Sequence, residues 1–166
     1  MKKVAIDEVN VVTNPMNVHS IRRPVSRALG TEEFAMNYFE LETGESFSGG
    51  LHTHYDQEEV FYVQSGTATF ETKIDGERDT VTVDAGEAIR FAPGEFQQGL
   101  NGEDEPVVGF AFGAPGATHD WDEIESITYC RDCEEETPHG LDLTEKGGFK
   151  MDCKECDMTF TIERSD

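Results

Sequence analysis

The sequence predicts an all-β chain, an antiparallel barrel of the jelly-roll type followed by a small metal-binding ribbon. Short runs rich in Val, Phe, Tyr and Thr recur between turn residues from Phe34 onward. No stretch shows the repeat of a long amphipathic helix. All four cysteines lie in two pairs near the C-terminal end. These three observations separate a β-rich body from a short cysteine-bearing module.

Six runs with the character of strands follow one another at short spacing in the body of the chain. Most of them are separated by turns that contain glycine, and Asp75-Gly76 is a pair that favours a tight hairpin. Regular strand spacing without intervening helices is typical of a sandwich or barrel. A further strand is expected at 4–12. The six runs are 34–42, 58–64, 67–74, 80–85, 87–93 and 107–112.

The strand pattern stops after Phe112, where a Gly/Pro segment passes into acidic sequence around Trp121. Composition shifts of this kind mark domain boundaries. We therefore expect a barrel domain with an N-terminal extension at 1–118, an acidic linker at 119–126 and a ribbon at 127–166.

The chain is strongly acidic, with 35 acidic and 13 basic side chains and a formal net charge of −22. Binding to a phosphate backbone needs clustered Lys and Arg, so nucleic acid is disfavoured as a partner. The only basic cluster is Arg22, Arg23 and Arg27, which we expect to be solvated. The acidic surface and the small number of lysines resemble proteins of salt-accumulating halophiles, in which salt screens self-repulsion.

No membrane partner is expected, because no apolar stretch approaches the roughly 18 residues of a membrane span. The apolar run near the N-terminus is broken by Asp7, Glu8 and Asn10, unlike a secretory signal. These features predict a cytoplasmic location, where cysteines stay reduced and paired Cys-x-x-Cys units favour metal over disulfides.

The two cysteine pairs, Cys130 with Cys133 and Cys153 with Cys156, are separated by 19 residues. This is the spacing of a four-cysteine zinc site, in which four thiolates close a tetrahedral shell. The shell leaves no open position, so we expect a structural Zn²⁺ that supplies the free energy for folding a short ribbon. His139 could replace a sulfur, but we expect a solvated loop residue.

A second metal site is predicted by His52 and His54, which share one face if they lie on a strand. Glu59 follows at the start of the next apolar run. Two imidazoles and a carboxylate suit a divalent transition metal, Fe, Mn, Ni, Co or Zn. Glu58 is the alternative carboxylate, although it should point to the opposite face from Glu59.

These residues resemble the first motif of the cupin family of small β-barrels, in which glycine, His-x-His, glutamate and glycine follow one another. Gly66 closes the motif here, and Gly44 lies two places further from His52 than usual. The second motif is matched by Gly86, Gly94 and Asn101, but Gln97 stands where the family has histidine. The resemblance covers about residues 34–113. It implies that Gln97 is a fourth ligand, or a group hydrogen-bonded to the ligands.

The resemblance implies a barrel that holds a small polar ligand or substrate beside the metal, and a homodimer. Dioxygenases and isomerases occur in the family, so an enzyme is one expectation, although the fold does not choose the reaction. The competing expectation is a non-catalytic metabolite sensor that contacts a protein partner through its zinc ribbon. Tyr62, Arg90 and Gln98 flank the motifs without an assignable role.

Overall fold

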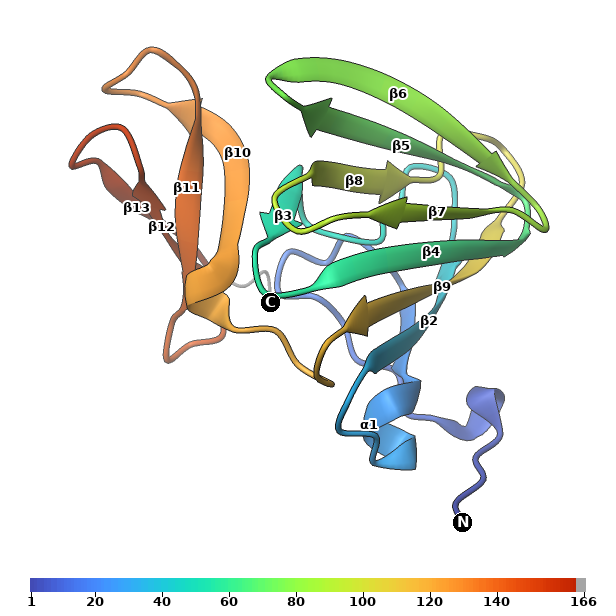
Figure 1. Cartoon of the computed structure of the whole chain (residues 1–166). Helices are drawn as coiled ribbons and strands as arrows, with labels where there is room; N and C mark the ends of the chain where they lie inside the picture. Colours follow the sequence, from blue (N-terminus) through green and yellow to red (C-terminus); the bar gives the residue numbers. More distant parts are fainter. Residues whose placement is uncertain (164–166) are drawn as a thin grey trace.

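The computed structural model describes residues 1–163, and within them nearly all of the regular secondary structure is antiparallel strand (Figure 1). The predicted all-β class is confirmed. The elements, in chain order, are η1 (Ile6–Glu8), β1 (Ile21–Pro24), α1 (Val25–Leu29), β2 (Ala35–Leu41), β3 (His52–His54), β4 (Glu58–Ser65), β5 (Thr67–Ile74), β6 (Glu77–Asp84), β7 (Ala88–Phe91), β8 (Phe96–Leu100), β9 (Val107–Ala114), η2 (Trp121–Glu123), β10 (Ile124–Cys130), β11 (Glu135–Leu143), β12 (Phe149–Cys153) and β13 (Thr159–Ile162).

The strands form two sheets. One has the order β1-β2-β9-β4-β7, and the other has the order β13-β12-β11-β10-β3-β8-β5-β6. Along β5 and β9, buried residues alternate with more exposed ones, which is the period-2 pattern of a strand with one face on a core. The predicted run at 67–74 coincides with β5, and the other five predicted runs each overlap a strand.

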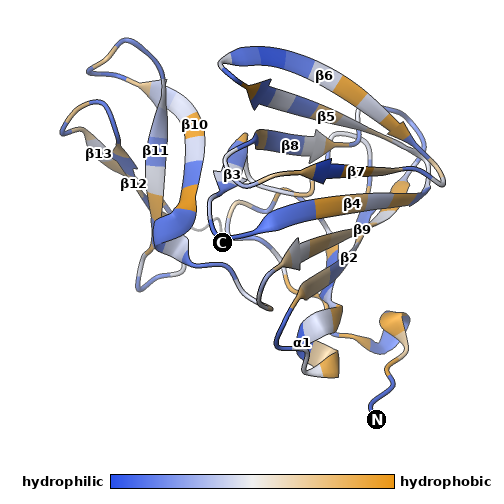
Figure 2. Ribbon diagram, viewed as in Figure 1, coloured by the Kyte–Doolittle hydropathy of each residue, from blue (hydrophilic) through white to orange (hydrophobic). Residues whose placement is uncertain are grey.

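Aromatic side chains dominate the core between the two sheets of the barrel. Figure 2 shows that β4 changes from hydrophilic to hydrophobic along its length. Phe61 and Val63, on its hydrophobic part, belong to the core, whereas Glu59 near its start does not. The other core side chains are Phe39, Leu41, Phe47, Ala68, Phe70, Val83, Phe91, Val107 and Ala111.

Two turns show why particular glycines are needed. Asp75 and Gly76 both have positive φ, as the predicted tight hairpin between β5 and β6 requires. Gly66 has φ of 78°, and a Cβ at this position would lie 2.6 Å from the carbonyl oxygen of Pro106. A larger residue at Gly66 would therefore be strained by its conformation and by a backbone contact.

The cysteine-bearing strands extend the barrel's larger sheet, because β10 pairs with β3. Strand β10 begins at Ile124, inside the segment that the sequence predicts to be a linker. Figure 1 shows β10 to β13 as an arm beside the barrel. The backbone of this arm is thus joined to the barrel by a strand ladder.

The prediction of a strand at 4–12 is wrong. Residues Ile6–Glu8 form a 3-10 turn, and the N–H of Val12 donates to the carbonyl of Arg22 as a single backbone hydrogen bond. The alternating pattern is interrupted by the acidic pair Asp7 and Glu8, and no neighbouring strand forms a ladder with this segment. Within residues 1–163, no helix is long and apolar enough to cross a membrane.

Candidate metal centre and ligand cavity

Strand β3 positions the two predicted histidines at the junction of barrel and arm. Gln97 on β8 pairs with His52 on one side, and Ser126 on β10 pairs with it on the other. Because side chains alternate along a strand, His52 and His54 project to the same side of this sheet, and Thr53 projects to the other. Their rings are 5.1 Å apart in an edge arrangement.

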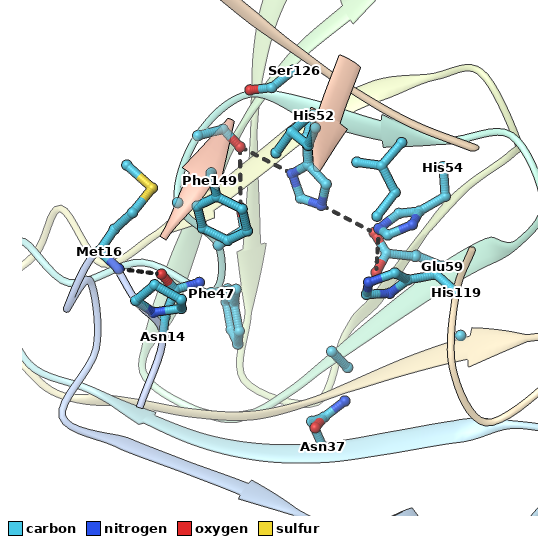
Figure 3. Close-up of a pocket in the computed structure, with 18 of the residues that line it drawn as sticks. Asn14, Met16, Asn37, Phe47, His52, His54, Glu59, His119, Ser126 and Phe149 are labelled. Atoms are coloured by element: carbon cyan, nitrogen blue, oxygen red, sulfur yellow. Dashed lines mark hydrogen bonds and ion pairs between the residues drawn. The ribbon is translucent and has the colours of Figure 1, made fainter. Parts of the chain in front are cut away.

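Glu59 on β4 comes from the opposite sheet and meets the two histidines. Its carboxylate oxygens lie 3.9 Å from the Nε2 of His52 and 3.6 Å from the Nε2 of His54. One potential ligand atom from each of the three residues lies within 4.8 Å of the others (Figure 3). The structure therefore brings together the three side chains that the sequence singled out.

The protonation of the histidines suits metal binding. The Nδ1 of His52 lies 2.9 Å from the carbonyl oxygen of Gly50 and donates to it, so Nε2 is the ring nitrogen that faces Glu59. Burial, helped by the charges of His52 and His119, lowers the pKa of His54 to about 3, so His54 is neutral at pH 7. Burial also raises the pKa of Glu59, an effect opposed by His52 and Gln97.

Gln97 is buried and completes this cluster as a hydrogen-bonding group. Its Nε2 donates to the carboxylate of Glu59 at 2.7 Å and lies 3.5 Å from the Nε2 of His52. The Oε1 of Gln97 and the Nδ1 of His54 are buried without a hydrogen-bond partner among the described residues. Buried polar atoms are rarely left unpaired, so these two mark a place where a further polar group fits.

The alternative carboxylate, Glu58, points away from the cluster and pairs with Arg90 on the surface. This is the opposite orientation from Glu59 that the strand alternation predicts. Tyr62 is also exposed, so neither it nor Arg90 lies in the cavity.

A third histidine near the cluster was missed by sequence reasoning. The ring of His119 lies 5.0 Å from that of His54 and 4.7 Å from that of Trp121, in the segment that follows the barrel. Burial and the charges of His52 and Arg22 lower the pKa of His119, against the effects of Asp56 and Asp120. In the sequence His119 stands alone, two residues before the single tryptophan, and no motif marks it as part of a site.

The cluster opens into a cavity of about 530 Å³ between barrel, N-terminal segment and arm. The barrel contributes His52, His54 and Glu59 together with Phe47 and Phe61. The arm contributes an apolar wall, and Phe149 of β12 packs on Trp121 at 5.7 Å between ring centres. The wall residues from the arm are Ile127, Leu141, Leu143, Phe149, Met151 and Ile162.

The four cysteines converge in the arm. The Sγ atoms of Cys130 and Cys156 are 3.5 Å apart, and those of Cys133 and Cys153 are 4.0 Å apart. Zn–S bonds of about 2.3 Å in a tetrahedron give S–S edges of about 3.8 Å, so these distances fit zinc. A hydrogen bond with the Thr137 hydroxyl lowers the pKa of Cys153 to about 6, whereas hydrogen bonds with Cys156 and Cys130 raise the pKa of Cys133.

His139 is not a solvated loop residue, and that prediction is wrong. It lies on β11, is 0% exposed, and stands opposite Cys153 in the pairing with β12. Its Nδ1 is 2.9 Å from the carbonyl oxygen of Thr137, and its ring packs against Phe160. It does not belong to the group of four close sulfurs, so it serves as a core residue of the arm.

Comparison with known proteins agrees with this architecture. Residues 37–112 match the family model described as the cupin domain. This part of the chain has the cupin fold. The match runs from β2 into β9 and includes His52, His54, Glu59 and Gln97, so the resemblance inferred from the two motifs is confirmed for this part of the chain. No curated protein sequence matches the chain significantly.

The solved structures that resemble the chain share the cupin fold at low sequence identity. A polyketide cyclase, RemF from Streptomyces resistomycificus, superposes with a TM-score of 0.62 and 23% identity over 80% of this chain and 89% of its own. A sugar phosphate isomerase from a cupin superfamily, from Silicibacter pomeroyi, gives 0.57 and 18% over 98% and 92%. Bacillus subtilis oxalate decarboxylase, a protein with Mn(II) centres, gives 0.51 and 22% over 60% of this chain but only 26% of its own.

Proposed function

We propose that the barrel of this chain binds a divalent transition metal through His52, His54 and Glu59, and holds a small polar ligand beside it. The observation that carries the proposal is the convergence of the three side chains at the wall of a 530 Å³ cavity, with His52 held in one tautomer by Gly50. Mixed imidazole and carboxylate ligands suit Fe, Mn, Ni, Co or Zn.

The donor set fits such an ion, and each residue has a definable task. His52 and His54 would provide neutral nitrogen donors, and Glu59 would reduce the net charge of the site. Gln97 orients the Glu59 carboxylate through its amide N–H, and its unpaired oxygen is a further potential donor. When bound, the ion supplies Lewis-acid polarisation of an oxygen-bearing ligand.

The second part of the proposal is that Cys130, Cys133, Cys153 and Cys156 bind a structural Zn²⁺. The sulfur separations support it, as does the small size of the arm, which lacks enough apolar surface to fold without help. Four thiolates fill the coordination shell, so this site would take no part in chemistry.

Metal analysis of the native chain and of His52→Ala tests both sites. We expect two bound metals per chain, one for each cluster, and one after the substitution, with zinc retained. Glu58→Ala is the control, because this carboxylate points away from the barrel cluster, lies outside both clusters and should leave both metals in place. An unchanged metal count in His52→Ala would remove the barrel from consideration as a metal centre.

As the first candidate function, we propose an enzyme in which the barrel metal assists a reaction of the bound ligand, such as an isomerisation or dioxygenation. The related folds include a sugar phosphate isomerase, an oxalate decarboxylase and a polyketide cyclase, and at such low identity they support the fold rather than a reaction. A screen of sugar and keto-acid substrates that follows oxygen consumption and product formation tests this proposal. Turnover that disappears in His52→Ala would support it.

One observation favours the second candidate, a metabolite sensor that signals to a protein partner through the arm. Strand β10 is hydrogen-bonded to the histidine-bearing strand β3, so a displacement of β3 on ligand binding would also displace β10 and the arm. Under this candidate, ligands bind without turnover and change hydrogen exchange in β10 to β13. Turnover in the substrate screen, with no such change in the arm, would favour the enzyme.

We also propose a homodimer, since cupin barrels commonly pair through edge strands. In the single chain, β1 pairs with β2 and the N-terminal segment lines the cavity of its own barrel. Sedimentation at high salt, which screens the net charge of −22, distinguishes a dimer from a monomer.

A further inference from the structure

Arg22 is a cation in the wall of the cavity with no carboxylate beside it. Its Nε donates to the Oδ1 of Asn37 at 3.1 Å, and Asn37 also lines the cavity. Among residues 1–163, no carboxylate oxygen lies within 4.0 Å of the Arg22 side chain. Burial lowers the pKa of this guanidinium, but an arginine of such high intrinsic basicity keeps its charge.

Arg22 differs from most unpaired cations of the chain in its burial. Lys2, Lys3, Arg27, Arg131 and Lys146 also lack a carboxylate within 4.0 Å in the described part of the chain, but they are exposed. Four cations of the described residues have a carboxylate within 4.0 Å, and all four lie near the surface: Arg78, Arg90, Lys150 and Lys154. A charge removed from water is costly unless it is paired. Arg22 is therefore suited to bind an anion that comes from outside the protein.

The remainder of the cavity limits what this counter-ion can be. Arg22 is the only Lys or Arg side chain among the lining residues, and one planar guanidinium matches one carboxylate. The apolar lining from Phe47, Phe61, Trp121 and Phe149 favours a hydrocarbon body rather than a heavily hydroxylated one.

We propose that the cavity binds a small organic monocarboxylate, with its carboxylate on Arg22 and its apolar body against the wall shared by barrel and arm. The inference deepens the proposed function and rests on it, because the other end of the ligand would lie beside His52, His54 and Glu59. Arg22, His52, His54 and Glu59 all line the same cavity, so the cation and the metal cluster face the same space.

Trp121 gives a direct readout, since it is the only tryptophan of the chain and lines the cavity. The zinc-loaded full chain is titrated with pyruvate, hexanoate and 3-phenylpropanoate, each beside its neutral amide, and Trp121 fluorescence is followed. We expect saturable binding of at least one carboxylate, and binding of its amide weaker by at least about tenfold. Equal affinity for carboxylate and amide, or no binding of any of the three carboxylates at millimolar concentration, would overturn the proposal.

The matched variants are Arg22→Gln and Arg27→Gln, the second being an exposed arginine on α1 outside the cavity. Arg22→Gln should lose at least about tenfold in carboxylate affinity, with little change for the amide, whereas Arg27→Gln should behave as the native chain. Unchanged carboxylate affinity in Arg22→Gln would overturn the inference. If that variant does not fold, Arg22→Lys and the comparison of acid with amide on the native chain decide the outcome.

Metal content separates this inference from the proposed function. Arg22→Gln should retain both metals, because Arg22 is not part of either cluster. Loss of carboxylate preference with both metals in place tests Arg22 alone. Conversely, a native chain that binds only zinc in the arm but still prefers carboxylates would retain the anion site and refute the barrel metal.

Discussion

Ser126 lies directly opposite His52 in the antiparallel pairing of β10 with β3. The Ser126 hydroxyl donates to the carbonyl of Leu51 at 3.1 Å, and the N–H of Ile127 donates to the same oxygen at 2.8 Å. Strand β10, which leads into the cysteine cluster, is therefore hydrogen-bonded to the segment that carries two candidate metal ligands, His52 and His54. Order in the arm and order in the barrel site should depend on each other.

Cys133→Ser should weaken both metal sites. Loss of one thiolate lowers zinc affinity in the arm, and the loosened β10 to β13 would no longer hold the apolar wall beside His52. We expect a lower melting temperature, loss of zinc, and weaker Ni²⁺ binding by the barrel in calorimetry. Asp132→Ser, exposed in the same turn, is the control. Unaltered Ni²⁺ affinity in a zinc-free Cys133→Ser protein would contradict the coupling.

Gln97→His should raise the affinity of the barrel for Ni²⁺ or Zn²⁺ by at least about tenfold, because imidazole is a better donor to these ions than a carboxamide. Gln97 is 1% exposed and already reaches Glu59 and His52, so the new ring would be correctly placed. Gln97→Leu removes the hydrogen bond to Glu59 and should lower the affinity. Competition titration with a chromophoric chelator measures both, and equal affinities in all three proteins would refute a role for this position.

His19 should make stability depend on pH below 6.5. It is 1% exposed, and burial lowers its pKa despite the hydrogen bond to the carbonyl of Ser46; the charge of Arg22 adds to the lowering and that of Glu45 opposes it. The unfolded chain thus takes up the proton first as pH falls, so stability is present above pH 6.5 and is lost below it.

Urea denaturation of the zinc-loaded chain at several pH values measures this effect. His19→Gln does not titrate, so its free energy of unfolding should fall less on acidification than that of the native chain. The difference in free energy of unfolding between the native chain and His19→Gln should therefore shrink by up to about 1.4 kcal/mol per pH unit below 6.5. Parallel pH profiles for the two proteins would show that His19 does not carry this dependence.

Asn101→Ala should destabilise the barrel by about 2 kcal/mol or more, because several buried backbone groups lose their partner at once. The Asn101 amide donates to the carbonyls of Leu41 and Glu105 at 3.0 Å each, and its oxygen accepts from the N–H of Glu103 at 3.0 Å. Asn10→Ala is the control, since Asn10 is exposed. Equal urea midpoints for the two variants would show that the amide network contributes little.

Local sequence specifies several of the strands and turns of this protein. Short runs rich in Val, Phe, Tyr and Thr between turn residues were enough to locate β5 and β9, and the Asp75-Gly76 pair was enough to locate a hairpin. The His-x-His pattern places two rings on one face because a strand has a period of two. Where alternation was weak and no partner strand existed, as at 4–12, the same reasoning failed.

Sequence alone therefore determined the β class, the two cysteine pairs and the set of His52, His54 and Glu59, since each depends on short-range periodicity or spacing. Only the tertiary structure decided that His119 lies beside His54, that Arg22 faces the cavity, and that the arm continues the barrel's sheet. These relationships join residues that are far apart in the chain. They depend on which strands pair and how the sheets close over one another, and no local pattern encodes that pairing.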